Sequence, residues 1–258
     1  MESNSLEAVR TNVIGTYLVA REAARIGAEE FVLVSTDKAV RPANVMGATK
    51  QLAERVVLAL QSSYPDCSFA AVRFGNVLGS SGSVIPVFRA QLERGEPLTV
   101  TDERVTRYFM TIPEAVQLIL QASLLPDLRG RVAMLDMGEP VRIMDLARDL
   151  LRLSGQPFRP GENVVVTGLR PGEKLHEELS GPHETVVRTE LDRVSVLHGK
   201  ESYGSLDKNI VEALETRDLE LLAKHALMLI EEGEGAPLTT VPRPLGGADS
   251  HSELLSSL

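Results

Sequence analysis

The spacing of apolar residues along the chain changes between a helical period and short continuous runs, and this predicts helices and strands in alternation. Apolar residues recur at helical spacing over 6–24, 45–64, 84–94, 112–125, 143–154, 206–214 and 219–232. Short apolar runs predict strands over 31–34, 69–74, 98–100, 132–135 and 164–166. Strands that alternate with helices favour an α/β fold with a mainly parallel sheet and helices on its faces.

The composition of the last part of the chain differs from the rest. From residue 233 the sequence is rich in Gly, Pro, Ser and Thr, which is typical of a flexible tail over 233–258. We expect residues 1–180 to form the main α/β region. Residues 181–232 would add a C-terminal strand and helices that pack on it.

Polar residues follow the first predicted strand directly. Ser35, Thr36, Asp37 and Lys38 come after the apolar run 31–34. In open α/β sheets ligands bind at this carboxyl end of the strands. An acid, an amine and a hydroxyl side by side indicate proton-transfer chemistry, although an isolated Asp-Lys pair is more often solvated.

A second group of residues opens the following helix. Met46 and Lys50 are four residues apart and therefore lie on one helix face. A lone helix lysine is usually solvated, so Lys50 becomes a candidate only together with the polar residues after the first strand.

Composition and charge limit the classes of function. A chain of 258 residues with 43% hydrophobic and 24% charged residues is ordinary for a globular protein. The one cysteine, Cys67, cannot form an internal disulfide, and the apolar runs are broken by charge before they reach the length of a membrane span. A net charge of −9 argues against a nucleic-acid surface but still allows an anionic substrate held by a few arginines. We expect a cytoplasmic protein that neither binds nucleic acid nor inserts into a membrane.

Several common catalytic motifs are missing from the sequence. It contains no P-loop, no nucleophile elbow and no H-E-x-x-H. The five histidines never take a metal-ligand spacing; they are His176, His183, His198, His225 and His251. We therefore expect no metal site.

Several longer motifs resemble one known family. The stretch STDKAVRPANVMGATK at 35–50 is similar to the signature of extended short-chain dehydrogenase/reductases that act as nucleotide-sugar 4,6-dehydratases. Further motifs match in the same order at 12–16, 72–86, 106–110 and 169–175. The resemblance covers about residues 6 to 180 and is nearest to the membrane-anchored polysaccharide-biosynthesis branch, which works on UDP-N-acetylglucosamine. It implies a partial Rossmann-like sheet, a small substrate-binding α/β subdomain, NAD as cofactor and lyase activity.

Members of that family begin with a βαβ unit whose glycine-rich turn holds the pyrophosphate of NAD. No G-x-G-x-x-G follows an early strand here, and Met1 starts inside what resembles a middle helix of the fold. The glycine-rich stretch Gly75–Gly82 follows a strand, but the resemblance assigns it to the sugar-nucleotide loop. We therefore expect the C-terminal part of a dehydratase, with the NAD-binding unit absent and an upstream half as a candidate partner.

The resemblance also implies roles for the residues after the first strand. Lys38 matches the base that takes the proton from sugar C5, Asp37 the acid that protonates the departing C6 hydroxyl, and Thr36 a donor to the C4 oxygen. Met46 stands where most short-chain dehydrogenases have tyrosine. A thioether cannot shuttle a proton, so either activity is lost or the chain follows a branch in which methionine is usual, the more economical explanation. NAD would be held by Ser35, Lys50, Phe74 and Gly75.

On the substrate side, the resemblance implies a UDP-sugar pocket. Arg107 and Arg170 match diphosphate-binding positions, and Glu173 a position near the uridine ribose. Thr99 and Thr101 would hold uracil through backbone groups, or they merely flank a strand. The remaining candidates lie in or after the glycine-rich loop: Asn76, Ser83, Val84 and Arg89, of which Arg89 could instead be an exposed helix residue.

Two classes of function remain open at this point. The first is an NAD-dependent UDP-N-acetylglucosamine 4,6-dehydratase of surface polysaccharide synthesis, with a nucleotide-sugar 4-epimerase as its near neighbour. Epimerases do not need the Asp37-Lys38 pair. The second is a non-catalytic fragment, or half of a split enzyme that depends on a partner. In either class we expect a homodimer through the helices at 6–24 and 45–64.

Overall fold

The computed structural model describes residues 2–80, 82–199 and 206–234. The chain divides into two compact units, each built from separate stretches of sequence. The described residues of the first unit are 2–74, 117–136, 178–199 and 206–234, and those of the second are 75–80, 82–116 and 137–177. Residues 235–258 of the predicted tail lie outside the described part.

The first unit contains a five-stranded sheet. Its strands, in spatial order, are β1 (Glu30–Val34), β2 (Ser68–Arg73), β7 (Val132–Leu135), β11 (Val194–Gly199) and β10 (Glu184–Arg188). β1, β2 and β7 are parallel, whereas β11 and β10 are antiparallel to their neighbours. The sequence-based prediction of an α/β fold with parallel strands is therefore confirmed. β1 lies at one end of the sheet, and no described strand pairs with its outer edge.

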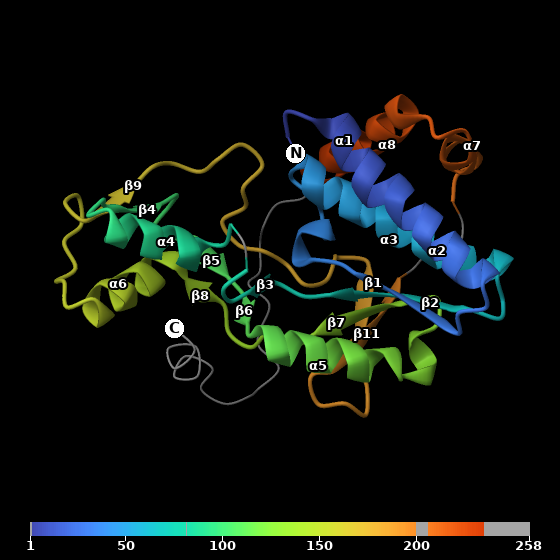
Figure 1. Ribbon diagram of the computed structural model, residues 1–258, viewed down its shortest axis with the longest axis horizontal. Coiled ribbons are helices and arrows are strands. Elements are labelled where there is room, and N and C mark those ends of the chain that lie inside the picture. The colour runs from blue at the N-terminus through green and yellow to red at the C-terminus, as the bar shows by residue number, and fades with distance from the viewer. Residues whose placement is uncertain (1, 81, 200–205, 235–258) are drawn as a thin grey trace. The chain divides into compact units, whose positions relative to one another are not determined.

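Helices cover both faces of this sheet (Figure 1). On one face lie α1 (Ser5–Val9), α2 (Thr16–Arg25), α3 (Val45–Ser63), α7 (Lys208–Thr216) and α8 (Leu219–Glu234), and on the other lies α5 (Ile112–Ser123). A π-helical turn, Arg10–Gly15, joins α1 to α2, so the predicted helix over 6–24 forms but is wider over these residues. A short 3₁₀ turn, Pro126–Leu128, precedes β7. No described helix has the length and apolar character needed to cross a membrane.

The core of the first unit forms between α3 and its neighbours. Apolar residues of α3 at helical spacing, Leu52, Val56 and Leu60, are buried together with Phe69 of β2. The helix begins at a polar cap, because the side chain of Asn44 accepts a hydrogen bond from Gly47 N at 2.9 Å. The local sequence thus accounts for the start of the helix and for its buried face.

The C-terminal helices α7 and α8 complete this core. Leu214 of α7 and Leu222 of α8 belong to the same cluster as Val13 and Val56, and Tyr17 of α2 donates a hydrogen bond to Glu215. One side of α2 and α3 is therefore covered by the chain itself, so a homodimer through these helices would need another side of them.

The homodimer stays a prediction, and α2 offers a surface for it. Val19 and Ile26, seven residues apart, are 63% and 84% exposed. We expect light scattering of the full chain at micromolar concentration to give twice the mass of one chain. Val19→Glu should return it to the single-chain mass, because a carboxylate would be buried in the contact. Val211→Glu, the same change at an exposed valine of α7, should leave the dimer intact. A single-chain mass for the unmodified protein would contradict the prediction.

The second unit is built around a smaller core. Its strands form three pairs: β3 (Asn76–Val77) with β6 (Phe109–Met110), β4 (Leu98–Val100) with β9 (Val164–Val166), and β5 (Thr106–Arg107) with β8 (Val141–Arg142). Helices α4 (Val84–Glu93) and α6 (Ile143–Leu153) supply buried residues, including Phe88 and Leu151. The sequence pattern did not reveal β3, β5, β6 and β8, because two residues are too few to show a period.

Candidate active site

The polar residues after β1 lie on a turn that is fixed to the sheet. Ser35 N donates to Val72 O at 2.8 Å, and Asp37 N donates to Phe74 O at 3.0 Å. These bonds continue the parallel ladder between β1 and β2 beyond the end of β1. The turn then closes as a short 3₁₀ helix, Asp37–Ala39, with Thr36 at its N-cap. The side chains of Thr36, Asp37 and Lys38 are therefore held by a rigid part of the sheet.

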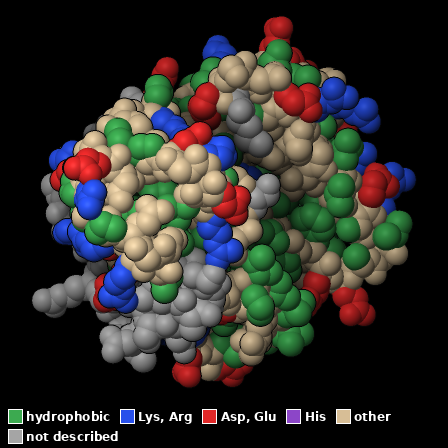
Figure 2. Space-filling model, turned by 60° about the vertical axis from the view of Figure 1, so that its left-hand side comes forward, with side chains coloured by type: hydrophobic (Ala, Val, Ile, Leu, Met, Phe, Trp, Pro, Cys, Tyr) green, Lys and Arg blue, Asp and Glu red, His purple; other side chains and the backbone are tan. Residues whose placement is uncertain are grey.

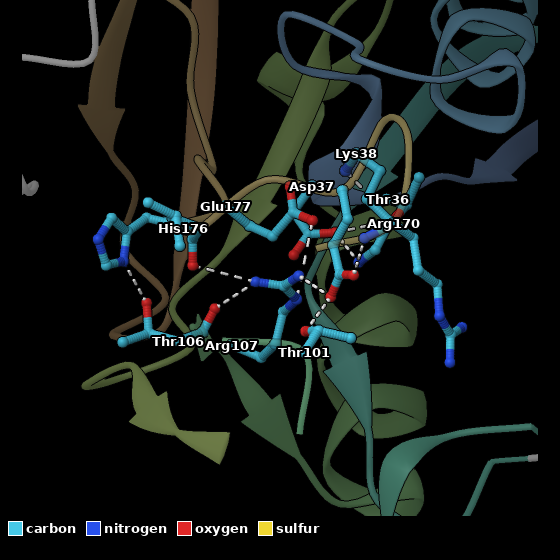
Figure 3. Close-up of polar contacts among 11 residues, drawn as sticks. Thr36, Asp37, Lys38, Thr101, Thr106, Arg107, Arg170, His176 and Glu177 are labelled. Carbon is cyan, nitrogen blue, oxygen red and sulfur yellow. Dashed lines mark hydrogen bonds and ion pairs between the residues drawn. The ribbon is translucent and has the colours of Figure 1, made fainter. Parts of the chain in front are cut away.

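Asp37 and Lys38 form an ion pair on this turn (Figure 3). Lys38 Nζ lies 2.9 Å from Asp37 Oδ1, and Thr36 Oγ1 donates to the same oxygen at 2.9 Å. Asp37 is fully buried, while the Lys38 side chain is 21% exposed. Asp37 Oδ2 is buried and has no hydrogen-bond partner among the described residues. An acid and an amine thus lie within proton-transfer distance of each other, and one acid oxygen is left without a protein donor.

Helix α3 packs unusually close to this turn, and Gly47 allows it. A Cβ atom at position 47 would lie 2.2 Å from the carbonyl oxygen of Lys38. No side chain fits there without moving the backbone of the turn. The sequence GATK after Met46 therefore positions α3 against the Thr36–Lys38 turn.

Lys50 reaches the end of β1 from α3. Its Nζ donates to Val34 O at 2.7 Å. Burial lowers the pKa of Lys50, and the charge of Glu54 opposes this shift. Met46, one helical turn earlier, is partly buried at the start of α3. The structure thus brings Lys50 and the residues after β1, which are distant in sequence, to the same end of the same strand.

A buried ion network that sequence analysis missed lies beside this site. Arg73 of β2 pairs with Glu54 of α3 and with Glu184 of β10, and Ser35 Oγ donates to Glu54. Two signals were available in the sequence: an arginine inside the apolar strand 69–74, and a glutamate four residues after Lys50. Neither signal identifies its partner, because Glu184 lies 111 residues from Arg73.

In the second unit, a separate polar cluster surrounds Arg107 (Figure 3). The Arg107 guanidinium is buried and donates to Thr106 O at 2.7 Å, to Leu175 O at 3.2 Å and to Glu173 Oε1 at 3.2 Å. It also lies 3.9 Å from Glu177 Oε1. Arg107 is thus held by oxygen atoms of the protein itself.

Glu173 joins two further sequence candidates to this cluster. Its Oε1 accepts from Thr101 Oγ1 at 2.9 Å, and its Oε2 accepts from Arg170 N at 3.2 Å. The side chain of Arg170 is exposed. Sequence analysis did not single out His176 for this cluster, yet its Nδ1 lies 2.8 Å from Thr106 Oγ1. The structure therefore brings together Thr101, Arg107, Arg170 and Glu173.

The other substrate candidates lie elsewhere in the second unit. Thr99 is engaged by Gln91, whose Nε2 donates to Thr99 Oγ1 at 2.8 Å and whose Oε1 accepts from Thr99 N at 3.2 Å.

Ser83 is the N-cap residue before Val84 opens α4, and its Oγ is buried without a partner among the described residues. Arg89 is an exposed residue of α4, and Asn76, the first residue of β3, donates through its backbone N to Tyr108 O at 3.0 Å. Gly75 opens the second unit, while Phe74 closes the preceding stretch of the first.

Three relatives with known names are similar to this chain. The capsular polysaccharide biosynthesis protein CapD of Staphylococcus aureus is 54% identical over 184 residues, which cover 71% of this chain and 30% of CapD. A UDP-N-acetylglucosamine 4,6-dehydratase (inverting) of Campylobacter jejuni is 32% identical over 68% of this chain and 51% of its own. A UDP-glucose 4-epimerase of Rickettsia canadensis is 35% identical over 67% of this chain and 50% of its own. The chain thus spans about half or less of the length of these relatives.

Solved structures share the fold of this chain, and a family model matches most of its length. Pen from Bacillus thuringiensis is 33% identical with a TM-score of 0.68, over 77% of this chain and 61% of its own. A dTDP-glucose 4,6-dehydratase from Bacillus anthracis in complex with NAD shares the fold at 17% identity and a TM-score of 0.58, over 67% of this chain and 59% of its own. Residues 1–198 match the family described as polysaccharide biosynthesis protein. This chain therefore belongs to the polysaccharide biosynthesis protein family, a group with the fold of short-chain dehydrogenase/reductases.

Proposed function

We propose that this chain carries the catalytic and substrate-binding residues of an NAD-dependent UDP-N-acetylglucosamine 4,6-dehydratase that acts in the cytoplasm. The observation that supports this most is the Asp37-Lys38 pair, with a 2.9 Å contact, on a turn held by the sheet beside Lys50. The reaction needs an acid and a base together, and this pair supplies both when the proton that the two residues share lies on Asp37 and leaves Lys38 neutral.

The same pair favours a dehydratase over an epimerase. Relatives with both names are similar to this chain, so identity alone does not separate the two activities. An epimerase inverts C4 and leaves the C5 proton and the C6 hydroxyl in place. A buried acid next to a lysine suits the dehydration step, in which a proton and a hydroxyl leave the sugar, and an epimerase has no such step.

Each residue of the turn would act at one atom of the sugar. When bound, NAD would supply the hydride chemistry, as acceptor at C4 and donor at C6 of the sugar. The 4-keto group makes the C5 proton acidic, and Lys38 takes that proton. Asp37 gives a proton to the C6 hydroxyl, which leaves as water, so the C5–C6 bond becomes a double bond. When hydride adds to C6, Lys38 returns its proton to C5, and the product is the 4-keto-6-deoxy sugar. Thr36 hydrogen-bonds the oxygen at C4. Water or Thr36 takes the proton of the C4 hydroxyl, since Met46 has none to exchange.

The residues present fit only one end of NAD. Lys50, which is partly buried, would hold the nicotinamide ribose, and Ser35, Phe74 and Gly75 are the other candidates for contact with NAD. For the pyrophosphate the sequence offers no G-x-G-x-x-G after an early strand. We therefore propose that an upstream half supplies a glycine-rich βαβ unit.

Two surfaces of the described chain support this partner. The outer edge of β1 pairs with no described strand, and Val34 on this strand is 50% exposed. Such an edge is the natural place for another parallel strand. Apolar side chains also line one side of α5 at four-residue intervals, at Ile112, Val116, Leu120 and Leu124, each at least half exposed. Hydrophobic side chains gather in a patch on the face shown in Figure 2. An apolar partner would cover such surfaces.

Separate calorimetric titrations of the full chain with UDP and with NAD test this proposal. We expect UDP to bind and NAD to bind weakly or not at all. Arg170→Gln should weaken UDP binding roughly 10- to 100-fold, because an exposed guanidinium that can pair with a phosphate is lost. Arg159→Gln, the same change at another exposed arginine, should leave the affinity unchanged. Binding of neither ligand would contradict the proposal and favour a non-catalytic fragment. Tight NAD binding would contradict the incomplete cofactor site.

A further inference from the structure

Three charged side chains that the proposed chemistry does not use lie together inside the first unit. Arg73 donates to both oxygens of Glu54, with the shortest contact at 2.6 Å, and to both oxygens of Glu184 at 2.8 Å. The side chains of Glu54, Arg73 and Glu184 are only 1%, 2% and 10% exposed. Burying three charged groups costs free energy. The two carboxylates carry more negative charge than one guanidinium can neutralise, so they need further hydrogen-bond donors.

Each carboxylate finds one such donor. Glu184 Oε2 accepts from Gly181 N at 2.6 Å, and Glu54 Oε1 accepts from the hydroxyl of Ser35. Ser35 is the residue immediately before Thr36. The network therefore extends from β10 through β2 and α3 to Ser35, the residue before the Thr36–Lys38 turn, which we call the catalytic turn.

Glu54 also lies one helical turn after Lys50 on α3. Its charge opposes the lowering of the Lys50 pKa that burial causes. The other charged groups on the turn packed against this part of α3 are Asp37 and Lys38, which pair with each other. The group that Lys50 contacts on β1 is the uncharged carbonyl of Val34.

We propose that Glu54 is a positioning residue for the site: held in place by Arg73 and Glu184, it fixes Ser35 and the catalytic turn relative to Lys50. The inference rests on the proposed function, because Lys50 and the turn residues are those to which we assign the chemistry. A buried ion pair often has no role beyond packing, so the test must separate positioning from general stability.

Glu54→Gln and Glu184→Gln form a matched pair for this test. Each change replaces a carboxylate that pairs with Arg73 by a neutral amide, which keeps one oxygen that accepts hydrogen bonds. Only Glu54 lies next to Lys50. Acetic anhydride reacts with the neutral amine of Lys50, and mass spectrometry follows this reaction across a pH series. The midpoint of the profile is the pH at which the amine loses its proton. We expect Glu54→Gln to shift the midpoint for Lys50 to lower pH, and Glu184→Gln to leave it unchanged.

Hydrogen–deuterium exchange of the amides at 35–39 measures the positioning itself. Ser35→Ala removes the hydroxyl that binds Glu54 and leaves every charge in place. We expect this variant to exchange faster at Asp37 N, whose bond to Phe74 O holds the turn, with the Lys50 midpoint unchanged. Exchange in the core strand β7 should stay as in the unmodified chain.

Two results would overturn the inference. One is a Lys50 profile that Glu54→Gln leaves unchanged, with normal exchange in Ser35→Ala. The other is an equal effect of the Glu54 and Glu184 variants on both measurements, as general loosening would give. If Glu54→Gln does not fold, as judged by thermal unfolding, the exchange rates of Ser35→Ala decide alone. Neither measurement needs NAD, UDP or turnover, so the outcome is independent of the calorimetric test of the function.

Discussion

Lys38→Met is expected to lower the dehydration of UDP-N-acetylglucosamine by about 10²–10⁴-fold, the usual contribution of a general base. The Lys38 amine lies 2.9 Å from Asp37 Oδ1 on a turn that the β1–β2 ladder continues to hold. Methionine fills a similar volume but accepts no proton. The variant should therefore fold normally and lose the step that removes the C5 proton.

Partial reactions of the chain combined with NAD and with the upstream half proposed to supply the NAD-binding unit make this prediction specific. Oxidation at C4 precedes the step assigned to Lys38, so the variant should still reduce bound NAD, which absorbance detects. It should fail to release the 4-keto-6-deoxy product or to incorporate solvent deuterium into the sugar. Lys224→Met, the same change at an exposed lysine of α8, serves as the control. If the variant lost both C4 oxidation and product formation, Lys38 would act at another step of the reaction.

Gly47→Ala is expected to destabilise the fold by about 1–3 kcal/mol, the usual cost of overpacking a tight site. The new methyl group would lie 2.2 Å from the carbonyl oxygen of Lys38, which is backbone and cannot rotate away. Either α3 or the Thr36–Lys38 turn must therefore move. Because both carry residues of the candidate site, UDP-sugar turnover should fall even in molecules that remain folded.

Gly15→Ala is the matched control for this substitution. Gly15 also lies in a helical segment, and a Cβ there would meet Arg10 O at 3.5 Å, an ordinary van der Waals distance. Alanine is the better helix former, so this change should be neutral or stabilising by about 0.5–1 kcal/mol. Urea unfolding curves of the two variants measure the difference. Equal stabilities would mean that α3 does not approach the turn as closely as the structure indicates.

The sequence alone determined the parts of this protein that depend on neighbouring residues. The long helices and the strands β1, β2, β4, β7 and β9 follow from apolar spacing, and their observed bounds differ little from those predicted. The juxtaposition of Thr36, Asp37 and Lys38 is a local property, because the three residues are consecutive and follow a buried strand. The family resemblance also rests on such local motifs, and the comparisons confirm it.

Only the tertiary structure decided which distant residues meet. Lys50 reaches Val34 because Gly47 lets α3 pack on the turn. Arg73 pairs with Glu184 because the folded chain brings the first residue of β10 back to β2. Sequence analysis likewise did not predict that α7 and α8 pack in the same core as α3. Apolar periodicity states which face of an element is buried but not which element buries it. Two-residue strands such as β5 leave no period at all, since long-range hydrogen bonding alone makes them strands.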